Sequence, residues 1–292
     1  SWCRFKRKSR FQEKKQSASS GFAERSLVCG KPPSPRCEFR QLYRMNNKQR
    51  GLALIFNQKH FQQELRLRER DGNDADKTNL TERFQELGFE VQSYDNLDEK
   101  NMMDSIQKAA KRDHKDADCF VCVFLSHGDE DHIFANDKKV NIKKITDLFR
   151  GNECESLVGK PKIFIIQASQ GKIAEEAVTG MAADDDEITT YFIPAGADFL
   201  ICCSVAEGDI SFLCHPVDCN FFIQDLCETL KHQGSTLEFT KLLTLVNMKV
   251  STRTQSSNKQ MPCFTSMLTK KLYFRPKEEQ TSTPSGSSSI QS

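Results

Sequence analysis

Two short segments carry the side chains of this chain that could do chemistry. Leu125-Ser-His-Gly128 follows one apolar run, and Gln167-Ala-Ser-Gln-Gly171 follows another. Histidine exchanges a proton near neutral pH, and a serine hydroxyl becomes a nucleophile when a neighbouring base activates it. A lone histidine after a strand is more often a structural residue than a catalyst, because histidine serves many roles. The interpretation therefore depends on what lies around His127 and Ser169.

Alternating strands and helices would position these two segments. Apolar runs typical of buried strands occupy residues 51–56, 89–94, 119–125, 162–167 and 199–203. Amphipathic helical patterns lie between most of them, and this order predicts an α/β fold with a mostly parallel sheet. Ligands of such sheets bind beyond the carboxyl ends of the strands. His127 and Ser169 follow two of those ends.

Finer features are also expected. A helix containing Leu80 and Phe84 should stop at Gly88, since glycine is common just after a helix. A hairpin is expected around residues 136–137, and a capping box, Ser235-x-x-Glu238, should open the last helix. Lys271-Leu-Tyr-Phe274 is interpreted as the last strand.

Composition limits the class of protein. No apolar run approaches the roughly 20 residues that span a bilayer, and the first thirty residues lack the apolar stretch of a secretory signal. We therefore expect a cytoplasmic or nuclear protein without membrane contact. Residues 1–50 contain fourteen Lys or Arg against three Glu. A solvated, disordered arm is the favoured interpretation, and nucleic-acid or acidic-membrane contact is the alternative, for which no base-reading motif is present.

Cysteines are frequent for a chain of this class. Several of the twelve, among them Cys119, Cys122, Cys202, Cys203 and Cys227, lie in apolar runs, so we interpret them as buried free thiols. Cys119-x-x-Cys122 has no second pair at the spacing of a zinc site, and the segment has the pattern of a strand. No metal site is predicted.

The segment around Ser169 matches a known signature. The caspase nucleophile motif reads Q-A-C-[RQG]-G, with a histidine about 50 residues upstream. Gln167-Ala-Ser-Gln-Gly171 matches four of its five positions, and His127 lies upstream at a comparable separation. Similarity continues through most of residues 50–276, for example in Asp118–Gly128 and Pro262–Leu272. The chain resembles the caspase family, and within it the executioner branch that includes caspase six.

This resemblance implies a caspase-like fold, with a six-stranded, mostly parallel sheet flanked by helices. A large-subunit region at 50–171 and a small-subunit region at 194–276 would be joined by an exposed linker at 172–193. A basic disordered arm or prodomain at 1–49 and a disordered tail at 277–292 would flank them. The acidic run at 184–186 is interpreted as solvated charge, with a processing site as the alternative.

The resemblance also implies residue roles. In an active member a cysteine thiolate attacks the peptide carbonyl after aspartate, the histidine protonates the leaving amine, and backbone N–H groups hold the oxyanion. The matching positions are His127 for the histidine, Gly128 for an oxyanion donor and Ser169 for the nucleophile. Arg70 and Gln167 match residues that bind the substrate aspartate. No cofactor is implied.

Two elements depart from the family pattern. Serine replaces the nucleophilic cysteine, and a serine hydroxyl needs a base oriented by a third group, whereas a thiol ionises readily near a cation. The second arginine of the aspartate pocket is also missing, with Leu213 nearest its position, and so is a neighbouring tryptophan. We expect a pseudoprotease that acts as a homodimer, or as a heterodimer with an active caspase. It would have protein substrates only if it retained peptidase activity.

Two alternatives stay open. The chain could be an active executioner caspase whose Ser169 reflects a gene-model or sequence error or acts slowly as a nucleophile, or it could be the product of a decaying gene copy. The altered region around Leu213 argues against a single-base error, because two separate elements depart together.

Overall fold

The computed structural model describes residues 41–129, 131–169, 196–204, 221–253 and 261–277. The predicted linker at 172–193, the acidic run within it and Leu213 lie outside the described residues, as do residues 1–40 of the basic arm. None of the described helices is long and apolar enough to cross a membrane.

A central sheet organises the described part of the chain. Its main path has the order β2-β1-β3-β6-β7-β8. These strands are β1 (Leu52–Asn57), β2 (Glu90–Asp95), β3 (Phe120–Asp129), β6 (Lys162–Ser169), β7 (Phe199–Cys203) and β8 (Cys263–Ser266). Neighbours from β2 to β7 are parallel, and β8 is antiparallel to β7. The predicted six-stranded, mostly parallel sheet is confirmed.

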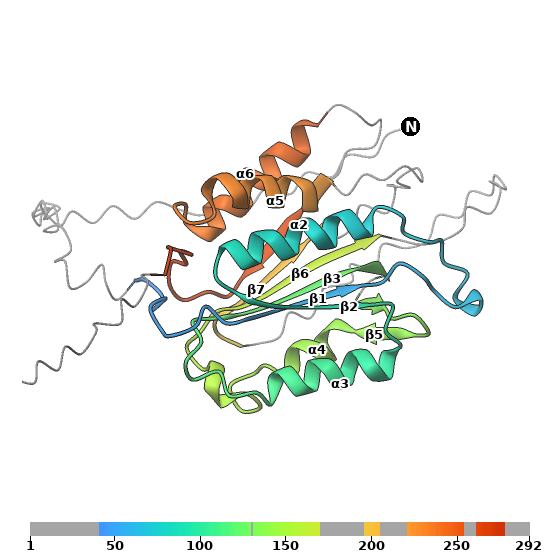
Figure 1. Cartoon of the computed structure of the whole chain (residues 1–292), viewed down its shortest axis with the longest axis horizontal. Helices are drawn as coiled ribbons and strands as arrows, with labels where there is room; N and C mark the ends of the chain where they lie inside the picture. Colours follow the sequence, from blue (N-terminus) through green and yellow to red (C-terminus); the bar gives the residue numbers. More distant parts are fainter. Residues whose placement is uncertain (1–40, 130, 170–195, 205–220, 254–260, 278–292) are drawn as a thin grey trace, which may run out of the picture.

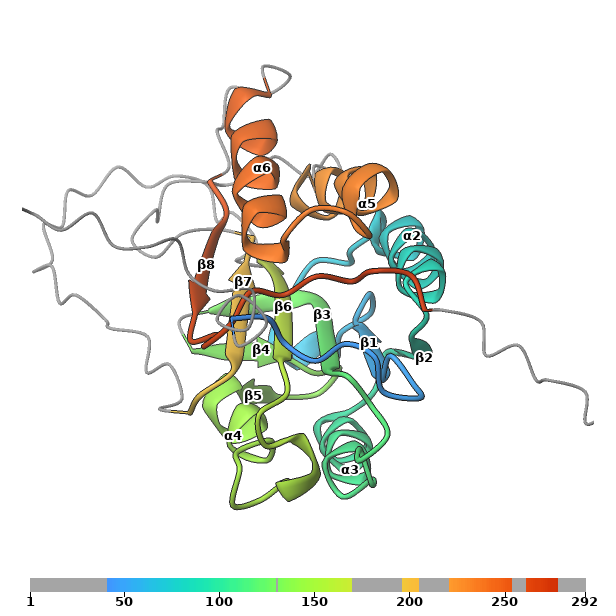
Figure 2. The ribbon, with the colours of Figure 1, turned by 90° about the vertical axis from the view of Figure 1, so that its left-hand side faces the viewer.

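Helices cover both faces of this sheet. On one face lie α2 (Asn73–Glu86), α5 (Phe221–Gln233) and α6 (Phe239–Thr252), and on the other lie α3 (Glu99–Ala110) and α4 (Ile142–Asp147) (Figure 1). Figure 2, turned by 90°, shows these two groups of helices on opposite sides of the sheet. Two short 3-10 helices, Gln63–Leu65 and Glu155–Leu157, lie in connections. The hairpin of β4 (His132–Phe134) and β5 (Lys139–Asn141) extends from the end of β3 and confirms the turn expected near residue 136.

The apolar run of β3 explains the two-layer packing. Successive strand side chains point to opposite faces, so Val121 and Val123 enter the core under α2, α5 and α6, while Phe120 and Phe124 enter the core above α3 and α4. Each helix presents one apolar side to one of these cores. In α2, Leu80 and Phe84 are buried as expected, and Gly88 follows with a φ of +86° that glycine adopts readily.

The last strand was placed wrongly by the sequence pattern. The strand that closes the sheet is β8, not Lys271–Phe274. Leu272 and Phe274 are buried against the α2–α5–α6 side, and the carbonyl of Lys271 accepts a hydrogen bond from the N–H of Tyr43 at 3.1 Å. An extended segment that buries alternate side chains has the same apolar pattern as a strand, which explains the error.

The expected capping box is also absent. Glu238 itself is the N-cap of α6, and its carboxylate accepts hydrogen bonds from the N–H of Lys241 at 3.1 Å and the N–H of Leu272 at 3.2 Å. The helix therefore begins at Phe239, and the buried Glu238 carboxylate joins it to the segment that follows β8.

The ordered fold extends beyond the boundaries that the sequence suggested. Residues 41–49, expected to belong to a disordered arm, pack on the core through the buried ring of Tyr43 and a backbone bridge between Gln49 and Ala117. Lys277, expected in the tail, donates a hydrogen bond to the carbonyl of Asn47.

Candidate active site

Strands β3 and β6 lie side by side and bring the two chemical segments together. Their parallel register pairs His127 with Ser169, Ser126 with Ala168, and Leu125 with Gln167. Both segments stand at the carboxyl ends of their strands, where ligands of α/β sheets bind. The pairing of His127 with position 169 follows from the backbone register alone.

Two described neighbours of the His127 ring are a backbone carbonyl and an aromatic ring. The side chain is 6% exposed, its Nε2 lies 2.7 Å from the carbonyl oxygen of Arg68, and its ring centroid lies 4.9 Å from that of Phe61. A carbonyl can only accept, so Nε2 must donate its hydrogen. In the neutral ring Nδ1 is then the nitrogen without a proton, and it can act as the base.

Asp131, a carboxylate close to His127 in the sequence, binds other partners. Asp131 Oδ1 lies 2.6 Å from His132 Nδ1, and Asp131 Oδ2 accepts a hydrogen bond from the Asn141 amide, also at 2.6 Å. The Asp131 side chain is about half exposed. In serine proteases a carboxylate binds the ring nitrogen that faces away from the nucleophile, and it stabilises the imidazolium. In this chain the backbone carbonyl of Arg68 binds that nitrogen, Nε2 of His127.

Gly128 lies where a side chain would not fit. A Cβ built at this position would stand 2.7 Å from the Cβ of Ala168 and 2.8 Å from the carbonyl oxygen of His132. Gly128 also pairs with Ile133 where β4 turns back along β3. The glycine therefore lets the end of β3 approach both β4 and the residue before Ser169.

Arg70 is positioned by a residue that the sequence interpretation missed. Arg70 is buried, and its Nε donates to the side-chain oxygen of Asn73 at 3.1 Å. The amide of Asn73 donates to the carbonyls of Gln58 at 3.1 Å and Leu125 at 3.2 Å, so it links Arg70 to the carboxyl ends of β1 and β3. The signal that could have revealed Asn73 is a polar residue directly after Gly72, at the first turn of a helix that points toward the sheet edge.

Gln167 completes the described part of this neighbourhood. It is buried in β6 opposite Leu125, one of the two residues whose carbonyls hold Asn73. Four of the expected site residues therefore lie at the carboxyl ends of β1, β3 and β6, namely Arg70, His127, Gln167 and Ser169. Phe61 is a further neighbour of the site that no sequence pattern indicated.

A caspase domain model matches residues 50–273. This chain belongs to the caspase family. It is 48% identical to Caspase-6 of Gallus gallus over 257 residues, which are 81% of this chain and 84% of that protein. It is 49% identical to Caspase-6 of Mus musculus over 255 residues (80% of this chain, 92% of that protein). Identity to Caspase-3 of Mesocricetus auratus is 41% over 240 residues (80% and 86%). The resemblance to caspase six inferred from the sequence is confirmed.

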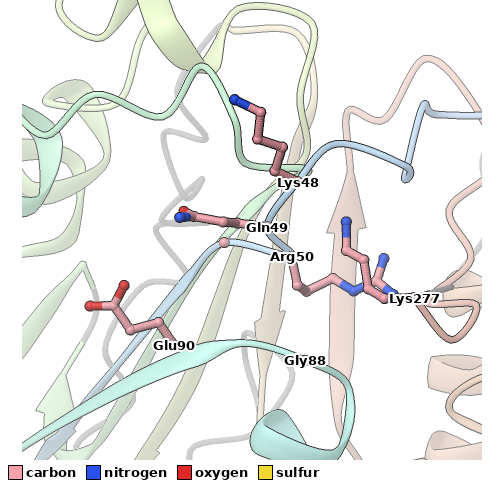
Figure 3. A pocket seen from close by; sticks show the side chains of 7 residues that line it. Lys48, Gln49, Arg50, Gly88, Glu90 and Lys277 are labelled. Atoms are coloured by element: carbon pink, nitrogen blue, oxygen red, sulfur yellow. The ribbon is translucent and has the colours of Figure 1, made fainter. Parts of the chain in front are cut away.

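A separate hollow lies at the opposite, amino end of the caspase sheet. It has a volume of about 280 Å³ and is lined by Lys48, Gln49, Arg50, Gly51, Gly88, Glu90 and Lys277 (Figure 3). Its buried cation, Arg50, binds Asp118 Oδ2 at 3.1 Å and donates to the carbonyls of Leu87 and Arg275. Lys277 binds the same carboxylate at 2.5 Å. These contacts hold the chain after β8 against the sheet, so we assign the hollow a structural role.

Within residues 41–129, 131–169, 196–204, 221–253 and 261–277, no group of three or more His, Cys, Asp or Glu side chains is placed to hold a metal ion. The Cys119-x-x-Cys122 pair lies inside β3 and its approach, with both thiols buried.

Proposed function

We propose that this chain is a caspase-family protein with strongly impaired or absent peptide hydrolysis, which acts by pairing with itself or with an active caspase. The observation that carries the proposal is the register of β3 and β6, which sets Ser169 opposite His127 at the nucleophile position of the family motif. The register supports position 169 as the nucleophile position, where the chain has a hydroxyl in place of a thiol.

The chemical step is the first to suffer. A cysteine beside histidine attacks as a thiolate, whereas a serine hydroxyl stays protonated and needs a base strengthened by a third group. At His127 the partner of Nε2 is the neutral carbonyl of Arg68, which stabilises an imidazolium less than a carboxylate does. Losing the proper nucleophile in a hydrolase can lower turnover by a factor on the order of 10⁶, so we expect a loss of several decades.

Binding of the substrate aspartate is the second step affected. Arg70 and Gln167 lie at the carboxyl ends of the strands, whereas in the sequence Leu213 is the residue nearest the family's second arginine. A hydrogen bond to a charged group contributes about 1.5–3 kcal/mol, so its loss should weaken aspartate binding by one to two decades. Nucleophilic attack and positioning of the substrate aspartate are separate requirements, so restoring the nucleophile alone leaves aspartate binding limiting.

An edge strand supports the pairing part of the proposal. β8 ends the sheet order and pairs with β7, and its last two residues, Thr265 and Ser266, are exposed. An exposed edge strand presents unpaired backbone groups to another chain, and a twofold partner covers such an edge in a self-complementary way. The dimer surface is therefore proposed at β8, the strand that takes the edge position expected for Lys271–Phe274.

Peptide cleavage assays on the full chain test the catalytic part. The native protein should not cleave an aspartate-containing peptide, and Ser169→Cys should restore measurable but small turnover, because the aspartate pocket stays incomplete. A thiol-directed peptide inhibitor should label position 169 in Ser169→Cys only. Native turnover within tenfold of an active caspase, in a preparation whose mass confirms serine at 169, would refute the proposal.

Sizing and co-purification test the pairing part. We expect a dimer at tens of micromolar, or co-purification with a tagged active caspase, and Ser266→Pro in β8 should weaken it because proline removes a backbone N–H that faces away from β7. Thr252→Pro, at the exposed end of α6, is the matched control. A strictly monomeric chain with no caspase partner would favour the decaying-gene alternative.

A further inference from the structure

Two thiols face each other across the last two strands. Cys203 ends β7, Cys263 begins β8, and the antiparallel register pairs these two residues directly. Their side chains are hydrogen-bonded to each other, and both residues are partly exposed. The sequence pattern predicted a buried free thiol at Cys203; in the structure this thiol is free but only partly buried.

The backbone geometry suits a covalent bond between them. Residues directly opposite in an antiparallel pair have Cα atoms about 4.5–5.5 Å apart, inside the range of about 4.4–6.8 Å seen in disulfides. Their Cβ atoms are about 4.5–5.5 Å apart, against about 3.5–4.5 Å in a disulfide. Closing that small difference requires only a local shift of β8, which has a strand neighbour on one side.

The other described cysteines differ from this pair. Cys119, Cys122, Cys154, Cys202 and Cys227 are all buried. Burial raises the pKa of the Cys202 thiol, which points to the opposite face of β7 and lies across from Phe264. Cys202 is adjacent in sequence to Cys203, so it provides a matched control in the same strand.

We propose that Cys203 and Cys263 form a reversible cross-strand disulfide that links β8 to β7 under mild oxidation. The oxidant is a small disulfide of the glutathione class. One protein thiolate attacks the small disulfide, forms a mixed disulfide and releases one small thiol, and the second cysteine then attacks the mixed disulfide and releases another. The protein loses two hydrogens, which leave on the two small thiols, as the protein sulfurs are oxidised and the small disulfide is reduced.

The contact with Cys263, followed by burial, raises the pKa of Cys203 well above the ordinary thiol value. The two thiols share one site, so either sulfur can make the first attack and the other then closes the bond. The slight misfit of the Cβ spacing should also make the bond easy to reduce, as strained disulfides are.

The bond would act on both the sheet edge and the candidate site. Ser204, directly after Cys203, donates its N–H to the carbonyl of Ile166 at 3.0 Å and its hydroxyl to the carbonyl of Ala168 at 3.4 Å. Ala168 precedes Ser169. The bond would also close a long loop that contains α5 and α6, and closing a long loop restricts the unfolded chain.

The test uses the full chain equilibrated in mixtures of oxidised and reduced glutathione, then alkylated and mapped by mass. We expect the loss of two hydrogens, a linked pair of peptides containing Cys203 and Cys263, and reversal by dithiothreitol. The oxidised chain should unfold at a temperature about 5 °C higher. Cys203→Ser and Cys263→Ser should each abolish the linked peptide, and Cys202→Ala should retain it.

Two outcomes would overturn the proposal. One is a stable glutathione adduct on Cys203 or Cys263 without any linked peptide. The other is two unmodified thiols in strongly oxidising mixtures. Both are read on the native chain, so the test does not depend on whether the serine variants fold.

Discussion

At the amino ends of the strands, Arg50 and Asp118 form a fully buried ion pair, whereas at the carboxyl ends His127 is held by the carbonyl of Arg68. The amino end is closed by charged groups that satisfy one another. Asp118 accepts from Arg50, from Lys277 and from the N–H of Asn47. At the carboxyl end, backbone carbonyls and the Asn73 amide hold side chains that could exchange protons or bind a ligand.

This difference shows which end of the caspase fold tolerates change. A buried charge that loses its partner destabilises the whole chain, so substitutions at the amino end affect folding. At the carboxyl end, exchanging a thiol for a hydroxyl at position 169 changes the chemistry and little of the packing volume. We therefore expect a caspase fold to tolerate the exchange of its nucleophile.

The largest effect is expected at Asp118. Asp118→Ala would leave Arg50 and Lys277 without their shared carboxylate, and breaking a buried pair costs roughly 3–5 kcal/mol. Denaturant unfolding would measure the loss. Asp116→Ala removes an exposed pair with Lys48 and should cost about 0–1 kcal/mol. Equal losses in the two variants would mean that the amino end is not held by its buried charges.

A smaller effect is expected from alkaline pH, again at the amino end. Burial, and then the hydrogen bond to Asp198, raise the pKa of Tyr43 to about 12. Because the folded pKa lies above the unfolded value of about 10, the contribution of Tyr43 is fully present below pH 10 and is lost as the pH rises toward 12. The free energy of unfolding should therefore fall more steeply above pH 10 in the native chain than in Tyr43→Phe.

A matched tyrosine controls for general alkaline effects. Tyr273→Phe changes a partly exposed tyrosine, and its alkaline slope should equal that of the native chain. Tyr43→Phe should also lose about 1–3 kcal/mol at neutral pH, because the phenol donates to Asp198 at 2.6 Å in a buried position. Identical slopes for native and Tyr43→Phe proteins would contradict the assignment.

The smallest effect is expected at Asp131, at the carboxyl end. Its carboxylate binds His132 and Asn141, so Asp131→Asn in the Ser169→Cys background should change kcat/KM by less than about twofold. His127→Ala in the same background should abolish the restored turnover. A tenfold or larger loss on Asp131→Asn would show that this acid supports His127, and that a serine nucleophile has more help than we propose.

Much of the fold could be predicted from local patterns. The apolar run of β3 predicts a strand buried on both faces, and the spacing of Leu80 and Phe84 predicts the buried side of α2, since burial imposes a period that the sequence displays. The segments at His127 and Ser169 were found because they follow such runs and match a family motif. Their roles in catalysis remain predictions.

Other features depend on contacts between residues far apart in the chain. The periods of a strand and of a buried extended segment are alike, so only the pairing of β7 with β8 shows that Lys271–Phe274 is not the edge. Neither the link from Asn73 to Leu125 nor the placement of Cys203 opposite Cys263 leaves a local signal. By itself, the sequence determined the order of elements, the core positions and the serine at 169. The tertiary structure alone decided which polar groups and thiols meet, because chain folding sets those distances and local spacing does not.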